Sequence, residues 1–444
     1  MAEATQEQPT IGEQTPAKTE LVAHSEDISL RQPKPSQQIA GYFETAQWTA
    51  DGTTILTTTS SDIVSAFVLP SDLLEARSEP LSLSPQASVP LGDRTNVLAS
   101  APYFNLSQAY TNQILVSSRD HPIQLFYLFP PSHDGSPATH TAASAYPLTK
   151  AHSETFETAN SLLWPSPGSH FIAGCKNFIA KFDVSRTGEE PLLRIKTIPS
   201  ERHLSKGGGV GMRGTISTLS AQPSEDGYSG LTAAGTWTRW IGLYDFAQAG
   251  ECTATWNIES AVQETRVGGN GGISGEGITQ TIWSPCGRYL LVSERKSSGI
   301  LVYDVRVTGQ LLGWLEDRVA SSNQKISCDV FPSQDGGFEV WSGTTSGTVK
   351  VWEGVGLTAG AQKPSWDWQA HESTVGSTCL HPTGTVIATC SGSWDFHGDK
   401  NIGNSQDLGE TGAEHPDVPM DWLRRRTNES TLKIWTLGAT AGGI

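Results

Sequence analysis

One pattern recurs seven times along this 444-residue chain and constrains its fold more than any other feature. In each copy an apolar residue follows a short turn, and an aromatic residue stands three positions after it, often with an acidic residue next. The copies are Val64–Phe67, Ile123–Phe126, Ile179–Phe182, Ile241–Tyr244, Ile300–Tyr303, Val349–Trp352 and Leu432–Trp435. Such a recurrence indicates one supersecondary unit that is used many times.

Turn clusters rich in Pro and Gly lie upstream of most of these aromatic residues. They are Trp48–Gly52, Trp164–Gly168, Trp283–Gly287, Phe331–Gly336 and Leu380–Gly384. Because proline presets φ and glycine tolerates a positive φ, each cluster predicts a hairpin turn. The apolar runs that follow, such as Tyr289–Ser293, read as strands buried between neighbouring sheets. The chain is therefore predicted to be all-β, as a seven-bladed WD-repeat β-propeller.

The spacing of the repeats locates the irregular parts of the chain. All intervals between successive aromatic residues, such as 59 residues from Phe67 to Phe126, exceed the usual propeller period of roughly 40 to 45. The longest, 83 residues from Trp352 to Trp435, predicts a flexible polar insertion at about residues 395–428.

The last repeat ends too close to the C-terminus to supply its own outer strand. We expect a strand within Ile28–Ile39 to supply it and close the ring, which removes the open edges of the sheet. The predicted domains are then a disordered tail at residues 1–27 and a propeller at residues 28–444.

Charge and motif content exclude several classes of function. The net charge of −16 argues against non-specific adhesion to nucleic acid or membrane, so any RNA contact must be a local patch. The six cysteines show no metal-binding spacing, and GxSxG and HExxH motifs are absent. Lys206–Arg213 lacks the end of a phosphate-binding loop and reads as a linker. We therefore expect a protein without enzyme activity, cofactor, bound metal or membrane span. We also expect it to be a monomer that resides in the nucleus or cytosol.

The histidines and tryptophans divide into structural and surface candidates. His152 and His371 stand in similar contexts before inner strands, where a hydrogen bond that buttresses a turn is the favoured role. Tryptophans at repeat positions should lie in the core: Trp48, Trp164, Trp283, Trp352 and Trp435. Tryptophans in blade loops could stack on a base or anchor a peptide, although loop packing is the commoner role: Trp237, Trp240, Trp366, Trp368 and Trp394.

Basic residues are dispersed among the blade loops. They are Arg119, Arg239, Arg295, Lys296 and Lys325. A propeller gathers equivalent loops onto one face, so these cations could form a local basic patch on an acidic molecule.

Several stretches resemble one WD-repeat family in order, over roughly residues 41 to 395. The most specific is Ser322–Val330, Ser-Asn-Gln-Lys-Ile-Ser-Cys-Asp-Val, followed by Ser342–Trp352. Ser117–Ile123 and Gly277–Arg288 add further matches. Together they resemble the telomerase Cajal-body proteins, which bind small Cajal-body RNAs, in a fungal form.

The resemblance implies a nuclear platform, in part cytoplasmic, that binds small nuclear or guide RNA. It would assist the localisation or assembly of ribonucleoproteins, including telomerase, and contact their proteins. Single-stranded bases would stack on aromatic side chains while Arg and Lys meet phosphates. Arg119 and Asn323 are RNA-binding candidates by motif, and Arg239, Trp240 and Lys325 by chemistry. The alternative is a protein-only scaffold, such as a substrate adaptor or a spliceosomal subunit.

Overall fold

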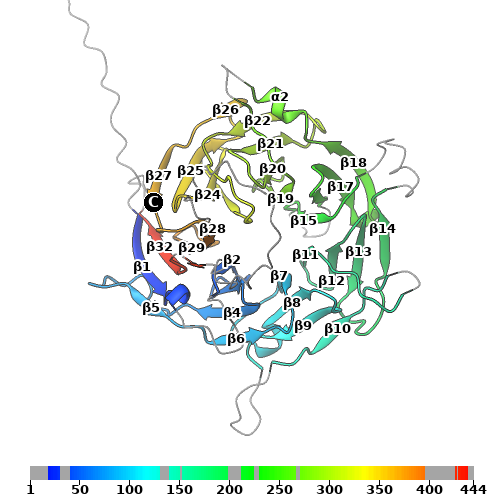
Figure 1. Cartoon of the computed structure of the whole chain (residues 1–444), viewed down its shortest axis with the longest axis horizontal. Helices are drawn as coiled ribbons and strands as arrows, with labels where there is room; N and C mark the ends of the chain where they lie inside the picture. The colour runs from blue at the N-terminus through cyan, green and yellow to red at the C-terminus, as the bar shows by residue number, and fades with distance from the viewer. Residues whose placement is uncertain are drawn as a thin grey trace, which may run out of the picture.

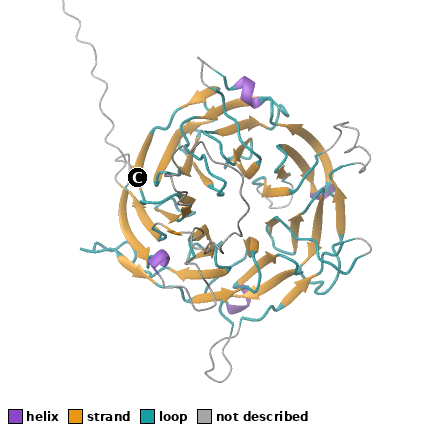
Figure 2. Ribbon diagram, in the orientation of Figure 1, coloured by secondary structure: helices purple, strands orange, loops and turns teal. Residues whose placement is uncertain are grey.

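Seven blades of four or five strands stand around a central axis (Figure 1), which confirms the predicted fold class. Strand pairing within the blades is antiparallel except at the two parallel fifth strands. The computed structural model describes residues 19–30, 41–130, 140–150, 153–198, 212–224, 230–266, 271–395, 426–427 and 429–438. Strands dominate this part of the chain (Figure 2).

Each blade runs from an innermost strand near the axis to an outer strand at the rim. Blade 1 contains β2 (Phe43–Trp48), β3 (Thr54–Thr59), β4 (Ile63–Val68) and β6 (Ala87–Pro90). Blade 2 contains β7 (Thr95–Ser100), β8 (Gln113–Ser118), β9 (Ile123–Tyr127) and β10 (Ser144–Tyr146). Blade 3 contains β11 (Ser161–Leu163), β12 (His170–Gly174), β13 (Phe178–Asp183) and β14 (Leu193–Lys196). Blade 4 contains β15 (Ile216–Ala221), β16 (Thr232–Thr236), β17 (Trp240–Asp245) and β18 (Glu251–Asn257).

The last three blades complete the ring. Blade 5 contains β19 (Ile278–Trp283), β20 (Tyr289–Glu294), β21 (Ile300–Asp304), β22 (Leu311–Leu315) and β26 (Gly360–Gln362). Blade 6 contains β23 (Cys328–Pro332), β24 (Phe338–Gly343), β25 (Thr348–Val355) and β27 (Trp366–Gln369). Blade 7 contains β28 (Val375–Leu380), β29 (Val386–Ser391), β32 (Leu432–Leu437), β1 (Thr19–Ser25) and β5 (Leu81–Leu83). A separate short pair joins β30 (Trp394–Asp395) to β31 (Arg426–Thr427).

Helical structure is confined to single turns in the described residues. These are 3₁₀ turns at Ile28–Leu30, Ala109–Thr111 and Phe246–Gln248, and the short helix α2 (Ala261–Glu264). None of the described helices has the length and apolar character needed to span a bilayer.

The predicted hairpin turns connect the first two strands of their blades. Their glycines, Gly52, Gly168, Gly287, Gly336 and Gly384, all have positive φ. At Gly384 φ is +71°, and an added Cβ would lie 2.2 Å from a ring carbon of Phe331. Both backbone conformation and close packing therefore require glycine at this turn.

Hydrogen bonds link the innermost strands of successive blades near the axis. Serine hydroxyls donate to the main chain of the next blade from Ser161 to Ile216, from Ser217 to Ile278 and from Ser377 to Ala46. Gln280 bridges blades 5 and 6 through both the N–H and the carbonyl of Cys328. These cross-links fix the inner ring on which the loops are mounted.

The strand that closes the ring lies nearer the N-terminus than predicted. β1 pairs antiparallel with β32, so Thr19–Ser25, and not a strand within Ile28–Ile39, supplies the outer strand of blade 7. Asp27, placed in the predicted tail, accepts a hydrogen bond from the Ser430 N–H. The outer edge of β1 pairs in parallel with β5. β1 has an irregular apolar pattern, which explains why sequence reasoning missed it.

Two predicted regions lie largely outside the described residues. These are the tail predicted at residues 1–27, of which residues 1–18 are not described, and the insertion predicted at about 395–428, of which residues 396–425 and 428 are not described.

Most of the apolar core lies between neighbouring blades. One cluster packs Leu291 of blade 5 against Val340 and Trp352 of blade 6. Among the tryptophans predicted for the core, Trp164, Trp283 and Trp352 are buried, whereas Trp48 and Trp435 are half-buried.

Candidate nucleic-acid interface

All five candidate residues lie on the same face of the propeller. We call it the connecting face, because it carries the turns between the second and third strands and the connections between blades. Arg119 lies in the β8–β9 turn, Arg239 and Trp240 at the β16–β17 turn, and Asn323 and Lys325 in the β22–β23 connection. Antiparallel strand order puts these segments at one end of their blades.

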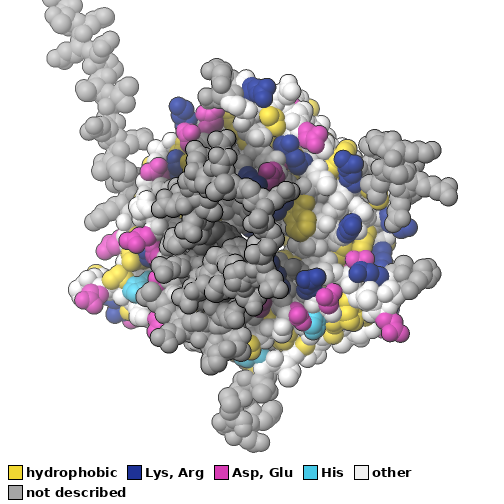
Figure 3. All heavy atoms as spheres, viewed as in Figure 1, with side chains coloured by type: hydrophobic (Ala, Val, Ile, Leu, Met, Phe, Trp, Pro, Cys, Tyr) yellow, Lys and Arg dark blue, Asp and Glu magenta, His cyan; other side chains and the backbone are white. Residues whose placement is uncertain are grey.

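Basic side chains are visible on part of the connecting face (Figure 3). In Figure 3, which views this face, visible Lys and Arg side chains lie mostly over the half formed by blades 3, 4 and 5. These cations lie among Asp and Glu side chains (Figure 3), on a chain with a net charge of −16.

The turns between second and third strands share one backbone conformation. A residue with positive φ occupies the turn in blades 1 to 6: Asp62, Asp120, Asn177, Arg239, Lys296 and Gly347. Asp, Asn and Gly adopt this conformation most readily, whereas in blades 4 and 5 the position is occupied by Arg239 and Lys296. Arg239 and Lys296 are thus held at the tips of adjacent blades.

The Arg239 guanidinium is engaged by a buried carboxylate. Its Nε and Nη2 donate to Oε1 and Oε2 of Glu294 at 2.7 and 3.0 Å. The Glu294 side chain is 1% exposed, and that of Arg239 is 16% exposed. Burial raises the pKa of Glu294, and the hydrogen bonds from Arg239 oppose this shift. Arg239 therefore joins blades 4 and 5 and has little capacity left for a phosphate.

The exposed tryptophan of this turn is Trp237. Trp240 is half-buried and packs against the core cluster that contains Tyr244 and Met212. Trp237 is 46% exposed, and the Arg295 guanidinium lies 5.8 Å from its ring centroid. An exposed indole beside a guanidinium can stack on a nucleobase.

One cation contacts this indole, and two more lie in the neighbouring turns. Arg295 donates to the Glu276 carbonyl, and Lys296 Nζ lies 2.8 Å from a Glu276 carboxylate oxygen. Arg213 is exposed, and its carbonyl accepts a hydrogen bond from the Thr238 hydroxyl next to Trp237. We call the set Trp237, Arg213, Arg295 and Lys296 the Trp237 platform. In the sequence, this platform could be recognised from the aromatic and basic residues of two turns, Trp237–Arg239 and Arg295–Lys296.

The family-like segment with Asn323 and Lys325 adjoins this platform. The Lys296 N–H donates to the Ser322 carbonyl at 3.2 Å. Asn323 and Lys325 are exposed, and surrounding protein lowers the pKa of the Lys325 ammonium by desolvation.

A buried arginine holds the β22–β23 connection in place. Arg318 is 1% exposed, and its guanidinium donates to Ser342 Oγ at 3.1 Å and to the Ile326 carbonyl. Burial lowers its pKa, and no carboxylate pairs with it in the described residues. Arg318 thus holds the loop against blade 6.

Arg119 lies apart from the platform, on blade 2. Its side chain is 74% exposed and lies 3.5 Å from the Asp120 carboxylate. Arg239, Trp240, Asn323 and Lys325 therefore share the part of this face over blades 4 to 6, whereas Arg119 lies over blade 2.

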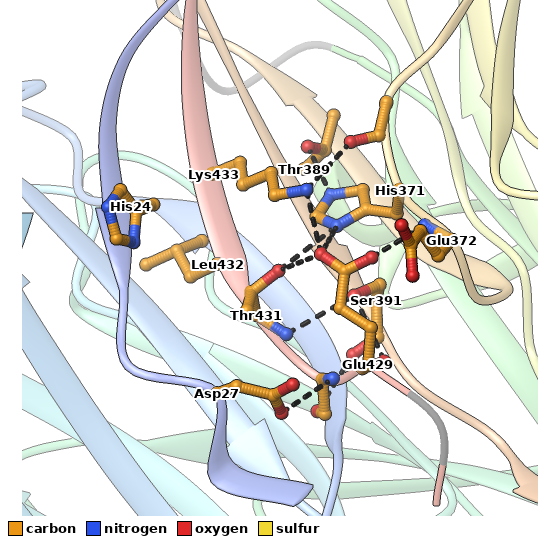
Figure 4. Close-up of polar contacts among 12 residues, drawn as sticks. His24, Asp27, His371, Glu372, Thr389, Ser391, Glu429, Thr431, Leu432 and Lys433 are labelled. Atoms are coloured by element: carbon orange, nitrogen blue, oxygen red, sulfur yellow. Dashed lines mark hydrogen bonds and ion pairs between the residues drawn. The ribbon is translucent and has the colours of Figure 1, made fainter. Parts of the chain in front are cut away.

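The polar network around His371 is structural, as the sequence predicted (Figure 4). His371 Nε2 lies 2.8 Å from Thr389 Oγ1, which also accepts from Trp435 Nε1 at 3.0 Å. Its Nδ1 lies 3.2 Å from Glu429 Oε1, and Lys433 pairs with the same oxygen at 2.7 Å. Burial lowers the pKa of His371, so the ring is neutral and links blade 7 internally. His152 lies outside the described residues.

The described residues offer no cluster of three or more His, Cys, Asp or Glu side chains suited to a metal ion. Four of the cysteines are buried, and Cys252 and Cys286 are exposed, all as free thiols.

Comparison with known proteins identifies relatives over nearly the whole chain. Telomerase Cajal body protein 1 of Mus musculus is 27% identical over 407 residues, which cover 91% of this chain and 67% of the relative. The Homo sapiens protein of the same name is 26% identical over 406 residues, covering 91% and 65%. The resemblance to the telomerase Cajal body proteins is confirmed.

A fungal relative also matches. It is the guanine nucleotide-binding protein negative regulator 1 of Schizosaccharomyces pombe, 26% identical over 314 residues, or 70% of each chain. No family model matches the sequence. The chain spans about two thirds of the length of the telomerase Cajal body proteins it matches.

Proposed function

We propose that this chain is a non-catalytic nuclear platform that binds single-stranded elements of small nuclear or guide RNAs and assists ribonucleoprotein assembly or localisation. The observation that carries the proposal is the exposed Trp237 beside Arg295, next to the loop with Asn323 and Lys325. Unpaired bases would stack on the indole, and neighbouring cations would meet phosphates. The telomerase and Cajal-body names of the relatives support the ribonucleoprotein context.

The local chemistry fits single-stranded RNA better than a duplex. A stacking platform needs an unstacked base, and the cations of this region are few and carried on separate blades. Arg213 lies before β15, Arg295 and Lys296 share the β20–β21 turn, and Lys325 lies in the β22–β23 connection, so the cations occupy three separate segments. Such spacing suits a flexible strand that follows a curved surface.

Fluorescence anisotropy with a labelled single-stranded RNA tests the proposal. Because stacking contributes about 1 to 3 kcal/mol per base, Trp237→Ala should weaken binding by about fivefold or more. Tyr110→Ala is the matched aromatic control, since Tyr110 is 68% exposed in the β7–β8 loop of the opposite face. Equal affinity of wild type and Trp237→Ala would contradict the platform.

Salt dependence separates RNA binding from the protein-only alternative. Binding through several phosphates should weaken steeply between about 50 and 200 mM salt, whereas an apolar peptide contact would change little. Lys325→Ala should reduce the slope of the logarithm of the binding constant against the logarithm of the salt concentration by about one. A protein-only scaffold, such as a splicing-complex subunit or adaptor, predicts no measurable RNA affinity in the same titration.

A further inference from the structure

A small polar pocket lies at the junction of blades 1 and 2, on the rim of the connecting face. Its volume is about 220 Å³, below the roughly 300 to 1,000 Å³ of most small-molecule sites. Its lining includes Asp93 after β6, Ser118 and His121 around the β8–β9 turn, Gln124 of β9 and His140 before β10. The size suits a single ring system better than a peptide.

Several hydrogen-bonding groups of this pocket have no partner. The Ser118 hydroxyl is buried, in a residue 4% exposed, and makes no hydrogen bond. His140 Nδ1 is likewise buried and unpaired, and Gln124 makes no side-chain hydrogen bond within the described residues. Buried polar groups are ordinarily paired, so these groups indicate a ligand with matching donors and acceptors.

The charged side chains in and near the pocket indicate which kind of ligand would fit. The Asp93 carboxylate lines the pocket, 3.4 Å from His121 Nδ1, and would repel a phosphate. Arg94 and Arg119 follow the lining residues Asp93 and Ser118 in the chain, both are exposed, and the Arg119 main-chain N–H donates to the Arg94 carbonyl. The pocket thus has a hydrogen-bond acceptor, Asp93, in its lining and two arginines in the adjoining turns. This arrangement fits a nucleotide whose base enters the pocket while its phosphate stays outside it.

We propose that this pocket receives one unstacked nucleobase bearing an amino group, with Asp93 accepting from that amino group and Ser118, Gln124 and His140 contacting the rest of the base edge. Phe126 and the Leu91 side chain supply the apolar walls. Amino groups donate to carboxylates, and uracil lacks one. The proposal rests on the proposed RNA binding, and assigns Arg119 to the phosphate beside this base.

Five-nucleotide RNAs that differ only at the centre test this assignment: UUUUU, UUCUU, UUAUU and UUGUU. With the full chain, the best amino-bearing RNA should bind at least tenfold more tightly than UUUUU. Asp93→Asn and Ser118→Ala should each reduce this preference by fivefold or more. Ser118→Ala removes an unpaired hydroxyl, so its melting temperature should not fall.

Asp120→Asn is the matched control, because it removes the same charge from the neighbouring exposed turn outside the pocket and should keep the preference. Binding of all four RNAs within twofold of each other would overturn the pocket assignment alone. Retention of the preference in Asp93→Asn would also overturn it. Absence of binding to every RNA would overturn the proposed function as well.

Discussion

At the scale of the residue, the pairing of Arg239 with Glu294 shows how a candidate surface cation can instead be structural. Glu294 lies in β20 of the next blade, 55 positions along the chain. Single-sequence reasoning identifies Arg239 as a loop cation but cannot show which carboxylate it meets. Its position in a left-handed turn was equally hidden, because that turn usually holds Asp, Asn or Gly.

Removing Arg239 should therefore destabilise the fold more than it affects RNA binding. Arg239→Ala leaves the Glu294 carboxylate buried without a partner and should lower the free energy of unfolding by about 3 to 5 kcal/mol. The double variant Arg239→Met with Glu294→Met should recover most of that loss. Chemical denaturation measures both, and a loss below about 1 kcal/mol in Arg239→Ala would contradict this role.

His371 should give the molecule a pH-dependent stability. Its pKa is lowered on folding from the ordinary value of 6.5, so the unfolded chain binds the proton more readily. Its contribution is present above pH 6.5 and is lost as the pH falls below that value. Thermal unfolding across this range should show a falling melting temperature, with a shallower dependence in His371→Gln. An unchanged pH dependence in that variant would exclude His371 as the source.

At the scale of the element, ring closure depends on β1. It lies between β32 and β5, and Ala23 and Ser25 are buried in the closed blade. A deletion through residue 25 should expose the edge of β32 and lower the melting temperature by roughly 5 to 10 °C. A deletion that ends at residue 18 keeps β1 and is the control. Equal melting temperatures for the two deletions would show that β1 does not close the ring.

The sequence predicts the repeated elements better than the closing one. Apolar periodicity and the Pro-Gly turns specify the inner three strands of most blades, because these patterns reflect burial and local backbone conformation. β1 pairs with a strand more than 400 residues away, and only the assembled ring determines which nearby segment fills that place. The parallel contact of β5 with β1 likewise has no local signal.

At the scale of the whole molecule, the propeller converts distant segments into one face. Its connecting face carries the Trp237 platform and the Asn323–Lys325 loop over blades 4 to 6, and Arg119 beside a pocket over blades 1 and 2. The sequence predicted that basic loops could meet on one face, but it could not rank Trp237 above Trp240. That ranking depends on which indole packs in the core of blade 4.

Crosslinking of the tagged protein to RNA in its own cells, followed by immunoprecipitation and sequencing, tests the central claim most directly. Wild type should enrich small nuclear or guide RNAs. Trp237→Ala combined with Lys325→Glu should reduce their recovery by about tenfold, in line with the loss of a stacked base and a phosphate contact. Tyr110→Ala should leave recovery unchanged. A clean absence of RNA from the wild type, with protein partners still recovered, would contradict the account and leave a protein-only scaffold.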